Sequence, residues 1–123
     1  DLFRCDDAEV LFVACNTPSR SVKGAVEELR KQGTKAGLFR PLTLWPFPID
    51  ALRPLLRRAK RLVVVEASPG QLEDELRLAL SYAGVAAPPI EHLQHYGGVL
   101  PQQSEVVALG LASRPAEVRG AIA

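Results

Sequence analysis

Four segments that follow apolar runs could carry chemistry, at residues 16–20, 40–48, 66–71 and 96–99. At the first, residues 16–20, the hydroxyls of Thr17 and Ser19 and the guanidinium of Arg20 could bind a phosphate together with the free N–H groups of a helix N-terminus. The alternative is an ordinary helix cap, in which Thr17 or Ser19 accepts hydrogen bonds from the first turn. No glycine-rich fingerprint or P-loop lysine accompanies these residues, so they are weak candidates for an anion site.

Glu66 begins the third segment, at the end of the apolar run RLVVVE. Ligands gather at the carboxyl ends of strands in open α/β sheets, so Glu66 could act as a general base or anchor a backbone amide of a ligand. The alternative is a structural carboxylate that accepts hydrogen bonds from the next loop.

The remaining polar residues argue against a metal site or a hydrolase. His92 and His95 are three residues apart in a predicted strand, so they point to opposite faces, and no third ligand accompanies them. Cys5 and Cys15 are ten apart with no CxxC motif. No serine lies in a GxSxG elbow. We therefore expect neither a catalytic residue nor a metal ligand in this chain.

Trp45 and Phe47 are candidate interface anchors, because large aromatic side chains on a rigid proline-rich turn are costly to leave in water. Alternatively, both rings fold back over the edge of the sheet. Arg53 and Arg57 belong to a basic cluster and would share one face of a helix at i and i+4. This cluster is either a solvated face or a docking surface for a protein.

The bulk composition indicates one globular domain. The 123 residues are 47% hydrophobic and 24% charged, with a net charge of +1, which gives no reason to expect nucleic acid binding. Residues 1–61 carry five more basic than acidic side chains, and residues 62–123 carry four more acidic ones, an asymmetry that can mark a docking surface. No apolar run is long enough to span a membrane, and the cytoplasm is the expected compartment. Because methionine is absent, we expect a domain excised from the C-terminal part of a longer chain.

Alternating strand and helix patterns predict a parallel sheet covered by helices on both faces. Continuous apolar runs predict strands at residues 9–15, 35–40, 61–66 and 90–93. Apolar side chains at helical spacing predict helices from residue 20 to Gly33, from Pro48 onward, and from Ser68 or Gly70 to about Gly84. Residues 104–111 and 116–122 are predicted terminal helices.

Three segments together resemble one enzyme family: RPLTLWPFP at residues 40–48, KRLVVVE at residues 60–66 and PGQLEDEL at residues 69–76. They are similar to the alpha subunit of 2-oxoacid:ferredoxin oxidoreductases of the 2-oxoglutarate, 2-oxoisovalerate and pyruvate types. The similar part is the domain that resembles the transketolase C-terminal domain, and it covers about residues 6–98. The first loop, CNTPSR, departs from the glycine-serine loop of many relatives.

The resemblance implies a three-layer α/β/α fold with a mostly parallel five-stranded sheet. One edge strand would run in the opposite sense, with residues 2–5 as its remnant. The parent enzyme would decarboxylate a 2-oxoacid oxidatively, using thiamine diphosphate, Mg²⁺, iron–sulfur clusters and coenzyme A, and would pass electrons to ferredoxin.

The cofactor ligands of the family lie in other domains, so the resemblance implies an assembly role for this one. Its other domains and subunits would contact the surface that bears the interface candidates, which are Arg40, Trp45, Phe47, Arg53, Arg57, Glu66 and Gln71. Two alternatives stay open. One is a binding module for an anion such as a phosphate of coenzyme A or of a nucleotide, and the other is the same domain in a different thiamine-dependent dehydrogenase or synthase.

Overall fold

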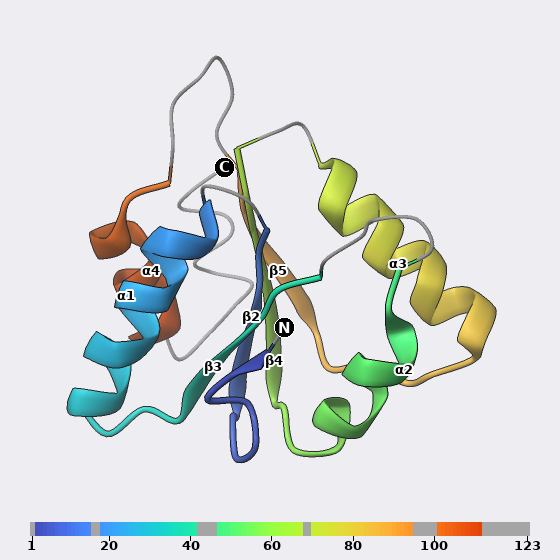
Figure 1. Ribbon diagram of the computed structural model, residues 1–123, viewed down its shortest axis with the longest axis horizontal. Helices are drawn as coiled ribbons and strands as arrows, with labels where there is room; N and C mark the ends of the chain where they lie inside the picture. The colour runs from blue at the N-terminus through green and yellow to red at the C-terminus, as the bar shows by residue number, and fades with distance from the viewer. Residues whose placement is uncertain (1, 16–17, 42–46, 68–69, 95–100, 112–123) are drawn as a thin grey trace.

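A five-stranded sheet forms the centre of the molecule (Figure 1). The computed structural model describes residues 2–15, 18–41, 47–67, 70–94 and 101–111. The spatial order of the strands is β1-β3-β2-β4-β5, and β1 alone runs antiparallel to its neighbour. The strands are β1 (Leu2–Phe3), β2 (Val10–Val13), β3 (Ala36–Phe39), β4 (Arg61–Glu66) and β5 (Ile90–Gln94). The mostly parallel sheet with one reversed edge strand is confirmed.

Helices cover both faces of the sheet, so the predicted three-layer α/β/α architecture is confirmed. Helices α1 (Pro18–Lys31) and α4 (Gln103–Leu111) lie together against one face. On the other face lie α2 (Ile49–Leu52), the 3₁₀ helix η1 (Arg53–Arg57) and α3 (Gln71–Ala83). The predicted helix at residues 116–122 lies outside the described residues.

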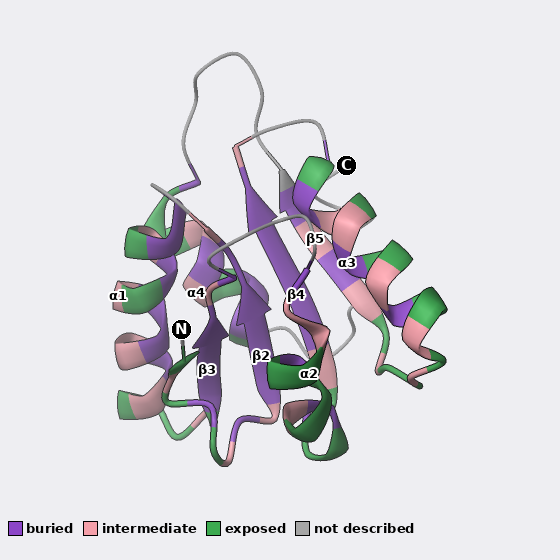
Figure 2. Cartoon of the chain, turned by 45° about the vertical axis from the view of Figure 1, so that its right-hand side comes forward, coloured by how far each residue is buried: buried purple, intermediate pink, exposed green. Residues whose placement is uncertain are grey.

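Alternation along the strands divides the core into two apolar clusters, one on each face of the sheet. On β4, Leu62 and Val64 belong to the cluster under α2 and α3, whereas Val63 and Val65 belong to the cluster under α1 and α4. All four side chains are almost fully buried, and Figure 2 shows the sheet as the most buried layer. The unbroken run of valines in the sequence therefore reflects a strand that is covered on both faces.

Glycines end the two long helices where the sequence places them. Gly33 has a φ of +89°, a left-handed conformation that glycine adopts without a steric cost. The Gly33 N–H donates to Arg30 O at 3.1 Å, and the Thr34 N–H donates to Leu29 O at 2.9 Å. These two bonds form a Schellman motif, which satisfies carbonyls that have no partner within the helix. Gly84 ends α3 in the same way, with a φ of +65°.

The segment after Pro48 differs from the single helix expected there. Regular α-helix ends at Leu52, and residues Arg53–Arg57 form a 3₁₀ helix instead. Pro54 cannot donate a backbone hydrogen bond, so the α-helical ladder loses a member at this point. A 3₁₀ helix has three residues per turn, so side chains at i and i+4 no longer lie one above the other. The prediction that Arg53 and Arg57 share a helix face is therefore wrong, although both side chains are exposed.

Candidate functional site

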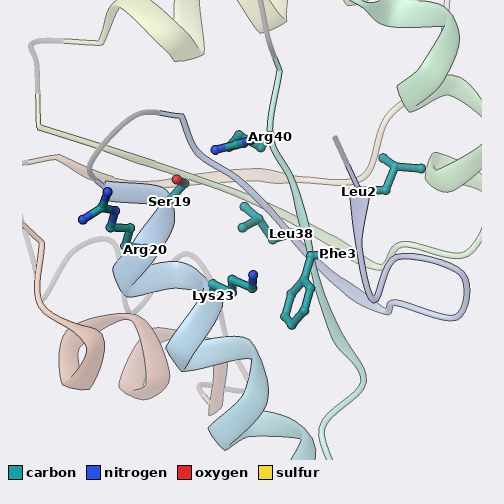
Figure 3. A pocket seen from close by; sticks show the side chains of 7 residues that line it. All are labelled: Leu2, Phe3, Ser19, Arg20, Lys23, Leu38 and Arg40. Atoms are coloured by element: carbon teal, nitrogen blue, oxygen red, sulfur yellow. The ribbon is translucent and has the colours of Figure 1, made fainter.

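A cavity of about 420 Å³ lies between α1, β3 and the edge strand β1. Three cationic side chains line it, Arg20 and Lys23 from the first turns of α1 and Arg40 directly after β3. Figure 3 shows Arg20, Ser19 and Arg40 towards one end, with Lys23 and Phe3 next to each other further along. Among the described residues, the lining includes these three cationic side chains and no acidic one.

Two of the three predicted anion-site residues line this cavity. Ser19 is buried, at 6% exposed, and Arg20 is exposed. Thr17, the third candidate, lies outside the described residues. The sequence analysis did not place Lys23 or Arg40 in the anion site. The position of Arg40 could have been found from strand alternation, because residues two apart in a strand point to the same face. Arg40 follows Leu38 by two residues, and Leu38 belongs to the cluster under α1.

Glu66 is a structural carboxylate that accepts hydrogen bonds from the next helix, the second interpretation given for it above. Its side chain is 4% exposed, and its two carboxylate oxygens accept hydrogen bonds from the backbone N–H groups of Leu72 at 2.8 Å and Glu73 at 3.0 Å. These N–H groups are in the first turn of α3, where they have no acceptor within the helix. The carboxylate therefore caps α3 and neutralises the positive end of its dipole.

The aromatic turn is only partly described. Phe47 is 8% exposed and lies in the cluster under α2 and α3, where its ring centroid is 6.1 Å from that of Phe39. Phe47 thus folds back onto the sheet, the second of its two interpretations. Trp45 lies outside the described residues, and its interface role stays a prediction. Gln71, at the start of α3, is exposed.

Next to Phe47 an apolar groove of about 570 Å³ runs along α3. Its lining comes from Phe47, from Ile49 of α2 and from five residues of α3, which are Glu75, Leu78, Ala79, Tyr82 and Ala83. Leu78 is 47% exposed and Tyr82 is 85% exposed. Large apolar side chains exposed next to one another on a helix are typical of a surface that contacts a partner.

A buried ion pair, which the sequence analysis missed, joins β4, β5 and α4. Arg61 donates two hydrogen bonds of 2.8 Å to the carboxylate of Glu91, whose side chain is 2% exposed. Arg61 also donates to Leu109 O at 2.7 Å and Gly110 O at 2.9 Å. Arg61 therefore holds the C-terminal carbonyls of α4 against the sheet. The two charges are 30 residues apart in sequence, so no local spacing signals the pair.

Both cysteines are in environments that disfavour the thiolate. Burial raises the pKa of the Cys5 thiol, whose Sγ donates a hydrogen bond to Leu38 O at 3.0 Å. Burial also raises the pKa of Cys15, and the nearby Glu66 carboxylate raises it further. The thiolate is the nucleophilic form of cysteine, so neither side chain is poised for nucleophilic chemistry.

The described part of the chain contains neither a group of metal ligands nor a helix able to span a membrane. Among the described residues, no three His, Cys, Asp or Glu side chains lie close enough together to hold a metal ion. His92 instead has its Nδ1 3.1 Å from a carboxylate oxygen of Glu73, and His95 lies outside the described residues. None of the helices that the structure describes combines the length and apolar character needed to cross a bilayer.

Comparison with known proteins places this geometry in a family. Residues 8–106 match the family model described as pyruvate:ferredoxin oxidoreductase core domain II. Over 74 residues the chain is 45% identical to the ketoisovalerate oxidoreductase subunit VorB of Methanothermobacter thermautotrophicus, covering 60% of this chain and 21% of that protein. The chain spans only about a fifth of the length of such curated relatives.

Two solved structures share the fold. A 2-oxoglutarate:ferredoxin oxidoreductase from Magnetococcus marinus, with 2-oxoglutarate, coenzyme A and succinyl-CoA bound, superposes with a TM-score of 0.69 at 24% identity. That match covers 83% of this chain and 17% of the other. A split-gene transketolase, an inactive beta4 tetramer, gives a TM-score of 0.73 at 18% identity, covering 93% of this chain and 41% of the other. The confirmed fold and the match over residues 8–106 together show that the chain belongs to the family of pyruvate:ferredoxin oxidoreductase core domain II.

Proposed function

We propose that this chain is an assembly domain of a 2-oxoacid:ferredoxin oxidoreductase, within a longer alpha subunit. The observation that carries this proposal is the family match over residues 8–106, in a chain that spans only about a fifth of its curated relatives. The complete enzyme would decarboxylate a 2-oxoacid oxidatively to an acyl-CoA and pass electrons to ferredoxin. The family match favours this parent over another thiamine-dependent dehydrogenase or synthase.

The polar side chains of this chain have structural roles, and this supports an assembly role over a catalytic one. The Glu66 carboxylate is engaged in capping α3, and burial keeps both thiols protonated. With two cysteines, the chain cannot ligate an iron–sulfur cluster that needs four. Thiamine diphosphate, Mg²⁺, the iron–sulfur clusters and coenzyme A would therefore be held by other domains and subunits of a cytoplasmic, oligomeric complex.

The apolar groove along α3 is the surface that we assign to contact with the rest of the enzyme. Leu78 and Tyr82 are four residues apart, so they share one face of the helix, and both are exposed. Two exposed basic side chains, Arg53 and Arg57, lie on the η1 segment and would form the charged rim of the groove. An apolar centre with a charged rim is the usual anatomy of a protein interface.

The experiment is a pull-down of the tagged parent subunit from its native cytosol, with each partner identified by mass spectrometry. We expect the thiamine-binding and iron–sulfur subunits to co-purify with the wild-type protein. Leu78→Lys should lose these subunits, because it places a charge in the apolar groove. Ser81→Lys is the matched control, since Ser81 is an exposed α3 residue that does not line the groove, and it should retain them.

The same variants separate assembly from folding. Leu78 is 47% exposed, so Leu78→Lys should leave the melting temperature close to that of Ser81→Lys. Recovery of a lipoyl-enzyme partner, or of no partner at all, would overturn the proposed function. Equal partner recovery by the two lysine variants would remove the groove from the interface.

A further inference from the structure

We propose that the apolar groove along α3 receives an amphipathic helix with oppositely charged flanks, basic next to α3 and acidic next to α2. This inference rests on the proposed assembly role and names the chemistry of the partner segment at that surface. Two elements line the groove: α2, through Ile49 together with Phe47 just before it, and α3, through five of its residues. The two elements are neighbours on one face of the sheet (Figure 1).

The α3 side of the groove has the spacing of a helix–helix contact. Its residues are 75, 78, 79, 82 and 83, the i, i+3, i+4, i+7, i+8 pattern of one helix face, and they extend over about 12 Å of helix. A different stripe, formed by Leu72, Leu76 and Leu80, is buried in the core of the domain. The groove face is exposed, since Tyr82 is 85% exposed. α3 therefore has a second face suited to packing against a helix.

Backbone hydrogen bonding favours a helix over an extended segment as the occupant. An extended segment binds by adding to a sheet edge, which supplies partners for its N–H and C=O groups. The groove offers no such edge, because its walls are helical, and Phe47 O, which lies outside the helices, already accepts from the Ile49 N–H at 2.8 Å. An extended occupant would place unpaired backbone groups against apolar side chains, whereas a helix bonds its own backbone.

Opposite charges on the two sides of the groove set the flanks of the incoming helix. Glu75 lines the groove from α3. On the α2 side, the Arg53 N–H donates to Ile49 O, so Arg53 lies one helical turn beyond a lining residue and on the same face. The Arg53 guanidinium is 3.9 Å from the carboxylate of Asp50, which is 95% exposed, and such exposed pairs contribute little. Charged flanks on either side of an apolar seam select partner helices in coiled coils.

A second copy of α3 does not satisfy this charge pattern. Side by side in a parallel pair, Glu75 would face its own copy, and like charges repel. In an antiparallel pair Glu75 would face the other end of α3, whose last turn contains no basic residue. We therefore assign the groove to a helix of different sequence, from another domain or subunit of the enzyme.

Photo-cross-linking from within the groove identifies the occupant in the parent subunit, purified together with its partners. Tyr82→p-benzoylphenylalanine places a photoreactive ring at an exposed position that lines the groove, and peptide mass spectrometry locates the residue it captures. We expect one segment with apolar residues at helical spacing, Lys or Arg on one flank and Asp or Glu on the other. A proline at the centre of that segment should abolish the cross-link, because proline breaks a helix.

Charge reversals on each side of the groove test the flanks. Glu75→Lys and Arg53→Glu should each lower the cross-link yield about fivefold at low ionic strength, the upper range for an exposed ion pair. The loss should shrink in 1 M salt, where the Debye length is about 3 Å, and misfolding would not produce that dependence. Asp74→Lys is the matched control, since Asp74 is an exposed acidic residue of α3 that does not line the groove, and its yield should stay unchanged.

Four results would overturn the proposal: no cross-link to another part of the enzyme, a cross-link to α3 of a second copy, a captured segment that tolerates the proline, or equal losses in Glu75→Lys and Asp74→Lys. The assembly role is judged separately, because it depends on which subunits co-purify with the parent subunit and not on what the groove captures.

Discussion

Arg61 is the residue on which the attachment of α4 to the sheet depends most directly. Its guanidinium contacts both oxygens of Glu91 and two backbone carbonyls of α4, while its side chain is only 12% exposed. Removing one member of a buried pair leaves the other charge without compensation, and that is more costly than removing both.

Arg61→Leu should therefore lower the free energy of unfolding by about 3 to 5 kcal/mol. The double variant Arg61→Leu with Glu91→Leu should recover part of this loss, because no uncompensated carboxylate then remains. Lys60→Leu is the control: its pair with Glu9 is on the surface, with side chains 76% and 44% exposed, and the expected loss is under about 1 kcal/mol. Urea denaturation measures all three. A double variant less stable than Arg61→Leu alone would contradict the role of the unpaired Glu91.

The pair of Asp7 with Arg30 makes stability depend on pH in the acid range. The hydrogen bond from Arg30 lowers the pKa of Asp7 below its ordinary value of 3.8. The folded protein thus keeps this carboxylate charged at a pH where the unfolded chain protonates it. The contribution is present above the unfolded pKa and is lost as pH falls through the lower folded pKa.

Asp7→Asn should accordingly be less stable than the wild type at neutral pH, and the gap should close as pH falls below 3.8. Chemical denaturation at a series of pH values measures the gap. Asp50→Asn is a control at a side chain that is 95% exposed, and it should stay close to the wild type throughout. A gap for Asp7→Asn that is independent of pH would show that its cause is not the ionised carboxylate.

At the scale of elements, close backbone approach explains one glycine of the sheet. A Cβ on Gly37 in β3 would lie 2.6 Å from Arg4 O and 3.0 Å from Cys5 Cα, both backbone atoms of the turn after β1. At Gly24 in α1, an added Cβ would meet only the end of the Gln103 side chain, which can move aside.

Gly37→Ala should lower the free energy of unfolding by about 1 to 3 kcal/mol, the usual cost of overpacking. Gly24→Ala should stay within about 1 kcal/mol of the wild type, because the better helix propensity of alanine offsets the displacement of Gln103. Thermal denaturation of the two variants compares them directly. If Gly37→Ala has the same melting temperature as the wild type, the turn after β1 moves aside at little cost in free energy.

Elements that follow from local patterns could be predicted, whereas contacts between distant residues could not. The apolar run of residues 61–66 and the acidic first turn after Gly70 predict β4 and α3 almost to the residue. The 3₁₀ segment at residues 53–57 was missed because apolar spacing does not distinguish two helix types over one turn. The cavity joins residues from β1, α1 and β3, and its lining depends on sheet order, which the sequence pattern leaves open.

At the scale of the whole molecule, the sheet separates two apolar clusters that share a backbone but not side-chain contacts. Val63 and Val64 are neighbours in sequence, yet they belong to different clusters. Val13 lies opposite Val64 in the parallel ladder and belongs to the same cluster as Val64.

Each of the single changes Val63→Ala, Val64→Ala and Val13→Ala should cost roughly 1 to 3 kcal/mol. The losses for Val63 and Val64 should add within about 0.5 kcal/mol, whereas those for Val64 and Val13 should not, because the second pair shares a cavity. Equilibrium denaturation of the single and double variants gives both coupling energies. Strong coupling between Val63 and Val64 would show that the two clusters respond as one.

The packing of α4 on α1 also has a consequence for the order in which the protein is made. A ribosome completes α1 early but α4 only after every strand of the sheet, and synthesis proceeds at about 5 to 20 residues per second. For several seconds the nascent chain therefore has an apolar side of α1 with no partner helix. During that interval this surface is available to a chaperone, and arrival of Gln103–Leu111 ends its availability.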